Sequence, residues 1–374
     1  MKPLSPVDAV VPAFSRIPTV LTPPAQPGTF RFGFFLKMAA VGAFTNPGFY
    51  GSTLACAGLG LSFTMLALTG RIWHSEWMAA PAAGALLLTA SVMAAVAALA
   101  LSLLLAWLWC RLRFTLFDLV VGRRGQVAAA WSAYGAQSWR YLGLMVLVTL
   151  ALLLLAASTA GPLFLRFIAA IRGMTLQQIN ASPAVVFAHI LPVYGILFVL
   201  EGTATFADAI AQDFLLPPMA LDDAPLQSAF GHLFRLLRDR FWSVVGYLLL
   251  RFALEIGLTC AGMLAVLLLL GAAAAAAAGL GFILYGALWH LGGAAALAFI
   301  LYCAAAATLL LGLWLLAMIA ACGVLAIFRQ CYAIYFYGSY YQELGNRLEP
   351  PEQTAAAPLA PVVPPLLPQP PPVW

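Results

Sequence analysis

The sequence predicts an all-α membrane protein: a polytopic bundle of about six transmembrane helices, with amphipathic helices at the cytoplasmic interface. Of its 374 residues, 64% are apolar and only 8% are charged, and the mean hydropathy is +0.97. A soluble domain needs about 25% charged residues. Several apolar runs also exceed the roughly 20 residues that cross hydrocarbon as a helix. Because the alternation typical of membrane β-strands is absent, helix is the remaining backbone that satisfies its own hydrogen bonds in lipid.

Six apolar segments are long enough to be spans. They cover residues 34–69, 81–110, 140–160, 184–206, 241–270 and 293–328. The first is interrupted by TNPGFYGS (45–52), where Pro47 should kink or break the helix. Residues 271–292 form a weaker stretch rich in alanine and glycine, which we interpret as an outer loop or a re-entrant segment. A seventh span remains an alternative there.

Around these spans the chain divides into three parts: an N-terminal cytoplasmic segment with an interfacial helix (1–30), the six-span domain (31–348) and a proline-rich, disordered tail (349–374). The first part has no continuous apolar stretch, so we expect no cleavable signal peptide. The tail should be extended, as polyproline is. Its PPLLPQPPP sequence could dock in an aromatic groove of a protein partner, although a tail without a partner is the favoured interpretation. No nucleic-acid partner is expected.

The basic residues predict the orientation. With both ends inside, 14 of the 18 lysines and arginines lie on the cytoplasmic side, as retention of positive charge requires. Arg71, Arg166 and Arg172 lie outside, and Arg251 lies within a span. We therefore expect a multi-pass protein of the bacterial inner membrane with both termini in the cytoplasm.

Three related segments suggest internal repetition. VVPAFSRI (10–17), AAAWSAYG (128–135) and LQSAFGHL (226–233) each precede an outgoing span. The chain can thus be divided into three units, each with an interfacial helix followed by two spans, related about an axis along the membrane normal. In the third unit, apolar residues at helical spacing alternate with arginines, which predicts a helix lying in the interface with its basic residues toward lipid headgroups.

Four motifs carry a resemblance to a known group. They are DAVVPAFSR (8–16), RFTLFDLVVGRR (113–124), QDFLLPPMAL (212–221) and RQCYAIYFYGSYYQEL (329–344). Together they resemble an uncharacterised family of bacterial six-span membrane proteins, which is similar to the membrane domain fused to some glycerophosphodiester phosphodiesterases. The resemblance implies the six-span architecture. The phosphodiesterase catalytic domain is absent from this sequence, so the resemblance implies no activity.

Glu201, Asp208, Arg251 and Glu255 are candidates for an intramembrane polar site. Charges at such depth each cost at least about 2.5 kcal/mol, so they should face protein or water. One interpretation is a polar cavity between spans four and five that binds a cation or carries protons. The favoured alternative is an ion pair of Arg251 with Glu201 or Glu255 that clamps the two helices, with Asp213 and its acidic neighbours in water.

A second candidate is a basic patch of possible lipid-headgroup contacts beside span two. It contains Arg111, Arg113, Arg123 and Arg124. Cytoplasmic basic residues attract anionic lipid by about 1 kcal/mol each, although their role in membrane topology is a sufficient explanation.

The sequence predicts no cofactor or metal site, because its six cysteines lie singly and its histidines are scattered. Three functions remain. The favoured one is a non-catalytic membrane protein, either an accessory subunit or a lipid-contacting scaffold. The second is a small-solute or ion transporter that uses the polar cavity, and the third is a lipid-modifying enzyme.

Overall fold

A computed structural model describes residues 3–23, 29–46, 81–122, 126–171, 183–288 and 293–349. Their secondary structure is entirely helical, which confirms the predicted all-α class. The elements are α1 (Val10–Leu21), α2 (Phe32–Thr45), α4 (Pro81–Gly122), α5 (Val127–Ala133), α6 (Gly135–Ile171), α8 (Pro183–Ile210), the π-helical turn η2 (Ala211–Leu215), α9 (Leu216–Leu221), α10 (Leu226–Leu288), α11 (Gly293–Gly338) and α12 (Gln342–Leu348).

Four helical segments of the described chain are long and apolar enough to cross a membrane. They are Gly135–Phe167, Ile190–Leu221, Leu226–Ala287 and Ala296–Gly338. They support a multi-pass membrane protein and correspond to predicted spans three to six. Helix α4 covers the predicted second span. Most of the predicted first span lies outside the described residues, so the total of six remains a prediction.

The structure corrects the interpretation of residues 271–292. After its kink at Arg240, helix α10 continues to Leu288, so residues 271–288 are helical and are not an outer loop or a re-entrant segment. The stretch is rich in alanine, which has the highest helix propensity of all residue types. The helix can therefore continue well beyond residue 270, the predicted end of span five. The break predicted near Pro47 is found: α2 ends at Thr45, and Asn46 is extended, as the residue before a proline prefers.

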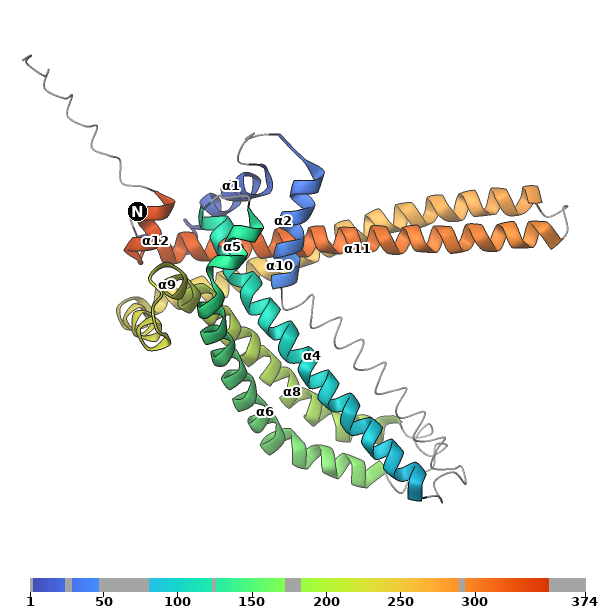
Figure 1. Cartoon of the computed structure of the whole chain (residues 1–374), viewed down its shortest axis with the longest axis horizontal. Helices are drawn as coiled ribbons and strands as arrows, with labels where there is room; N and C mark the ends of the chain where they lie inside the picture. Colours follow the sequence, from blue (N-terminus) through green and yellow to red (C-terminus); the bar gives the residue numbers. More distant parts are fainter. Residues whose placement is uncertain are drawn as a thin grey trace, which may run out of the picture.

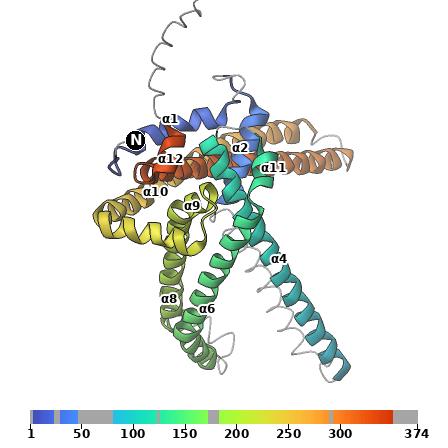
Figure 2. The same cartoon turned by 60° about the vertical axis from the view of Figure 1, so that its left-hand side comes forward.

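The long helices form two groups that diverge from a common region (Figures 1 and 2). Helices α10 and α11 form an antiparallel hairpin, while α6 packs against both α4 and α8. The shorter helices α1, α5, α9 and α12 gather where the two groups meet. The principal hydrophobic core lies at this junction and includes Phe114, Phe214 and Phe336. Farther along the long helices the apolar side chains are mostly exposed, as they would be against lipid.

A short helix precedes α2, α6 and the main part of α10, as the three-unit division predicts. Helix α1 precedes α2, and α5 precedes α6. In α10 the non-helical backbone of Arg240 (φ −140°, ψ 39°) separates residues 226–239 from the following span. Three preceding helices are therefore present, while their position in a membrane interface remains a prediction.

Helices α2 and α11 approach within backbone contact. A Cβ added at Gly42 would lie 2.6 Å from the carbonyl oxygen of Gly323, and one at Gly323 would lie 2.6 Å from the carbonyl carbon of Ala39. Small residues at a crossing allow such close packing between membrane helices. This contact fixes α2 against the middle of α11.

Candidate functional site: a buried ion-pair cluster

Three buried arginines, each on a different helix, pair with carboxylates from neighbouring elements. Arg113 of α4 pairs with Asp208 of α8 at 2.6 Å, and Arg329 of α11 pairs with Glu255 of α10 at 2.6 Å. Arg251 of α10 pairs with Asp213 of η2. The arginine side chains are at most 4% exposed. The six residues therefore form a charge-balanced cluster, here called the ion-pair cluster, that joins five elements.

The π-helical turn positions the central carboxylate. The amide of Leu216 donates to the carbonyl of Ala211, five residues earlier. Pro217 and Pro218 follow directly and cannot donate the usual bonds to the carbonyls of Asp213 and Phe214. A widened turn fits this loss, and turns of this kind often occur at functional sites. It places the Asp213 side chain inside the protein, where it is 1% exposed.

Arg113 is held on three sides. Its two terminal nitrogens donate to the two oxygens of Asp208, both at 2.6 Å, in the bidentate arrangement. One of them also donates to the Tyr141 hydroxyl at 3.0 Å. The guanidinium carbon lies 3.6 Å from the ring centroid of Trp109, close enough for a cation–π interaction. Only arginine offers this planar fork together with ring stacking.

Asp213 and the adjacent Gln212 make further hydrogen bonds with α10 and α11. The Tyr247 hydroxyl donates to an Asp213 carboxylate oxygen at 2.7 Å. The same oxygen accepts the hydrogen bond from Arg251. The adjacent Gln212 donates its side-chain amide to Gln330 of α11 at 3.0 Å. The end of α8 is thereby tied to both helices of the hairpin. The cluster therefore links the two diverging helix groups at the point where they meet (Figure 1).

Three of the four residues predicted for the intramembrane site form ion pairs, but with other partners than predicted. Asp208, Arg251 and Glu255 all belong to the ion-pair cluster, but each pairs with a residue outside the predicted set. Glu201 has an exposed side chain and takes no part in the ion pairs of the described residues. The predicted pairing of Arg251 with Glu201 or Glu255 is wrong, because Asp213 is the partner. The expectation that Asp213 lies in water is wrong for the same reason.

The predicted basic patch is also only partly present. Arg113 is fully buried in an ion pair, so it cannot contact a lipid headgroup. Arg111 is half-buried, lies 4.6 Å from the Trp131 ring centroid and donates to the Trp131 carbonyl. Arg123 and Arg124 lie outside the described residues. The sequence did not identify Arg113 and Arg329 as buried charges. Both lie at predicted cytoplasmic ends of spans, where the rule for membrane orientation already accounts for a basic residue.

Several buried polar atoms of the ion-pair cluster and of the neighbouring Gln330 have no hydrogen-bond partner in the described part of the chain. They are the Nε atoms of Arg113, Arg251 and Arg329, Nη2 of Arg329, Nε2 of Gln330 and Oδ1 of Asp213. Such atoms usually bind water when a few polar groups converge. No group of three or more potential metal ligands occurs among the described His, Cys, Asp and Glu side chains. The chemistry of the cluster is therefore that of paired charges with a few unused donors.

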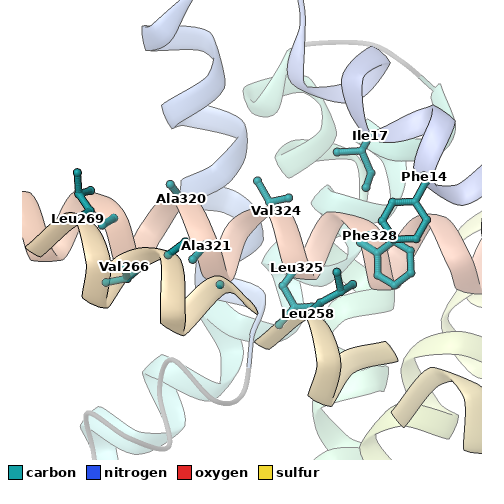
Figure 3. A pocket seen from close by; sticks show the side chains of 13 residues that line it. Phe14, Ile17, Leu258, Val266, Leu269, Ala320, Ala321, Val324, Leu325 and Phe328 are labelled. Carbon is teal, nitrogen blue, oxygen red and sulfur yellow. The ribbon is translucent and has the colours of Figure 1, made fainter. Parts of the chain in front are cut away.

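An apolar cavity of about 420 Å³ lies between α1 and the α10–α11 hairpin. Figure 3 shows Phe14 and Phe328 at one end and Leu269 at the other, with alanine and valine of α11 along one wall. The Phe14 and Phe328 ring centroids are 4.5 Å apart. Its lining side chains are all apolar, so it suits hydrocarbon and cannot orient a polar solute.

The comparison with family models assigns the chain. Residues 4–347 match a family of unknown function, DUF7544. The protein belongs to this family. Neither the curated proteins nor the solved structures that were searched gave a match. The DUF7544 match covers the ion-pair cluster and the helices described above, except for the last residue of α12.

Proposed function

We propose that this DUF7544 protein is a non-catalytic integral membrane protein, acting as a lipid-contacting scaffold or an accessory subunit in the bacterial inner membrane. One observation carries the proposal: each buried arginine of the ion-pair cluster is already neutralised by a carboxylate from another element. Separating such a pair costs about 3–5 kcal/mol. A solute that used one of these charges would have to offset that cost, so the arrangement favours a helix clamp.

The exposed surface supports contact with lipid. Leucine, phenylalanine and isoleucine side chains are exposed along both helix groups, including Leu153, Phe198, Phe282 and Leu309. Contiguous apolar surface of this kind marks membrane or protein contacts. We propose that lipids cover most of it and that both termini are cytoplasmic. If the protein is an accessory subunit, the proline-rich tail (349–374) is the segment that would contact its partner.

A transporter is the second candidate, favoured by one observation. The unpartnered polar atoms around Asp213, Arg329 and Gln330 could hold water along a path for protons or small ions. The test is substrate-dependent flux in liposomes. Flux that is abolished by Asp213→Asn and retained in Glu201→Gln, whose side chain is exposed, would favour the transporter.

The scaffold proposal is tested by native mass spectrometry of the full chain, gently extracted from its own membrane. A stoichiometric protein partner, lost on deletion of residues 350–374, supports an accessory subunit. The protein alone with bound lipid supports a scaffold. A discrete polar solute bound in place of both overturns the proposal and directs attention to the ion-pair cluster.

A further inference from the structure

A polar cavity of about 270 Å³ lies at the kink of α10. It is lined by His232, Arg235, Leu236, Asp239 and Arg240 of α10 and by Tyr337, Tyr340 and Tyr341 at the end of α11. The kink at Arg240 separates the short helix 226–239 from the span that follows. The cavity, here called the kink cavity, is therefore placed where the chain passes from an interfacial helix into a span.

The arginines of the kink cavity differ from those of the ion-pair cluster. Arg235 and Arg240 have exposed side chains, and neither belongs to an ion pair among the residues that the structure describes. Among the residues that the structure describes, the Arg235 side chain makes one hydrogen bond. It is a long one of 3.4 Å to the carbonyl of Gly231 on the same helix. These guanidinium groups keep their donors available for a ligand.

The opposite wall of the kink cavity is rigid and aromatic. The Tyr337 and Tyr341 rings stack with centroids 5.4 Å apart, and His232 meets Tyr341 edge-on at 5.6 Å. The Tyr341 hydroxyl donates to Asp222, and the Tyr340 hydroxyl donates to the carbonyl of Leu4 at 3.3 Å. Because these contacts fix the tyrosines, little ordering is needed when a ligand binds against them.

Large exposed aromatic side chains flank the kink cavity along α10. Phe234 is 66% exposed, Phe241 52% and Trp242 81%. Tryptophan and other aromatic residues are favoured at the level of lipid headgroups. A helix with apolar side chains on one side and arginines on another can lie in that plane. The mouth of the cavity would then open among headgroups.

We propose that the kink cavity binds the phosphate group of an anionic phospholipid. Two available guanidinium groups match a phosphate, which accepts bidentate, charge-assisted hydrogen bonds from arginine. Asp239 lowers the net positive charge of the lining, and the phosphate would lie between the arginines and the tyrosine wall. This inference rests on the proposed role as a lipid-contacting scaffold and names the lipid class and its site.

Single substitutions that each remove one positive charge test the proposal. Arg235→Gln and Arg240→Gln change the kink cavity. Arg238→Gln is the matched control, because Arg238 is exposed on the same helix and does not line the cavity. The full chain is purified in detergent, given equal amounts of phosphatidylglycerol and phosphatidylcholine, and analysed by native mass spectrometry. Thermal unfolding confirms that all forms are folded.

The wild-type protein should retain phosphatidylglycerol preferentially. Each cavity variant should lower that preference by at least about tenfold, the effect of losing a hydrogen bond to a charged group. Arg238→Gln, which removes the same charge outside the cavity, should change it by less than about twofold. Equal losses in all three variants would mean diffuse attraction and would overturn the site.

Displacement of phosphatidylglycerol by millimolar inorganic phosphate would show that free phosphate is the ligand and would overturn the lipid assignment. If lipid is retained without preference, this inference fails while the scaffold proposal stands. A bound polar solute in place of lipid overturns both.

Discussion

Arg251 and Asp213 form a buried ion pair between residues 38 positions apart, joining α10 to the π-helical turn at the end of α8. Their side chains are 4% and 1% exposed, and the Tyr247 hydroxyl donates to the same carboxylate oxygen. A charge this well enclosed has no water to compensate for the loss of its partner. The pair is therefore the element of the ion-pair cluster whose disruption should be most costly.

Removing one member of this pair should destabilise the protein strongly. Arg251→Met leaves Asp213 charged and buried, and Asp213→Leu leaves Arg251 in the same state. Each is expected to lower the free energy of unfolding by about 3–5 kcal/mol, the usual effect of an uncompensated buried charge. The double variant removes both charges and should recover most of the loss. The measurement is denaturant unfolding in detergent, read as a double-mutant cycle.

The exposed carboxylate of Glu201 provides the control for this cycle. Glu201→Gln should leave the free energy of unfolding within about 0.5 kcal/mol of the wild-type value, since surface substitutions rarely do more. If the two single changes at the pair were strictly additive in the double variant, the two side chains would not be coupled, and the clamp interpretation would be wrong.

Arg113 should not tolerate lysine. The change keeps the positive charge but removes the bidentate contact with Asp208 and the stacking on Trp109. We expect a loss of about 1–3 kcal/mol in the free energy of unfolding, typical for a charged hydrogen bond broken inside a protein. Thermal unfolding of the purified protein in detergent is the measurement.

Arg140→Lys is the matched comparison, because Arg140 pairs with Asp223 on the surface, with side chains 43% and 61% exposed. Exposed pairs contribute little, so this change should be nearly neutral. Equal effects at Arg113 and Arg140 would contradict the role assigned to the buried fork.

The sequence predicted the helical membrane class, and three of the six members of the ion-pair cluster, Asp208, Arg251 and Glu255, were among its candidates for an intramembrane polar site. It could not predict the partners. Helical spacing places Glu201 and Asp208 on one stripe, but the two prolines after η2 widen the last turn, and this brings Asp213 to Arg251. A single shifted turn changes which face a side chain occupies, and composition carries no sign of it.

Arg113 and Arg329 show a second limit. A basic residue at the end of a span satisfies the rule for membrane orientation whether it lies in water or is buried, so that rule does not locate its side chain. The available signal was the shared pattern of RFTLF, QDFLL and RQCYA near the ends of α4, α8 and α11. Each joins polar or charged residues to aromatic or aliphatic ones, as expected where three helices meet in a polar core.

Alkaline pH should act on the contact between Tyr341 and Asp222. Burial, followed by the hydrogen bond to the Asp222 carboxylate, raises the pKa of Tyr341 above its usual range. Because the pKa is higher in the folded than in the unfolded chain, the stabilisation is complete below the unfolded value of about 10 and declines as pH rises beyond it. Tyr341→Phe should be less stable at neutral pH, and its melting temperature should fall less steeply above about pH 10. Parallel pH profiles for the two proteins would contradict this assignment.

The crossing of α2 and α11 should depend on the absence of a side chain at Gly323. An added methyl group would overlap the backbone of Ala39, whose carbonyl carbon would lie 2.6 Å from it. Backbone cannot rotate away as a side chain can, so Gly323→Ala has to move one helix. We expect a loss of about 1–3 kcal/mol in the free energy of unfolding, the usual effect of overpacking.

Gly312→Ala on the same helix is the control, because a Cβ there meets no atom within 4 Å. That change should be neutral or stabilising by up to about 1 kcal/mol, because alanine favours helix over glycine. A second measurement is the separation of two spin probes on exposed positions, Lys37→Cys in α2 and Leu316→Cys in α11, in a protein whose six native cysteines are replaced. The separation should change in Gly323→Ala and stay the same in Gly312→Ala. If Gly323→Ala were as stable as Gly312→Ala and showed the same probe separation, the close approach of the two helices would be wrong.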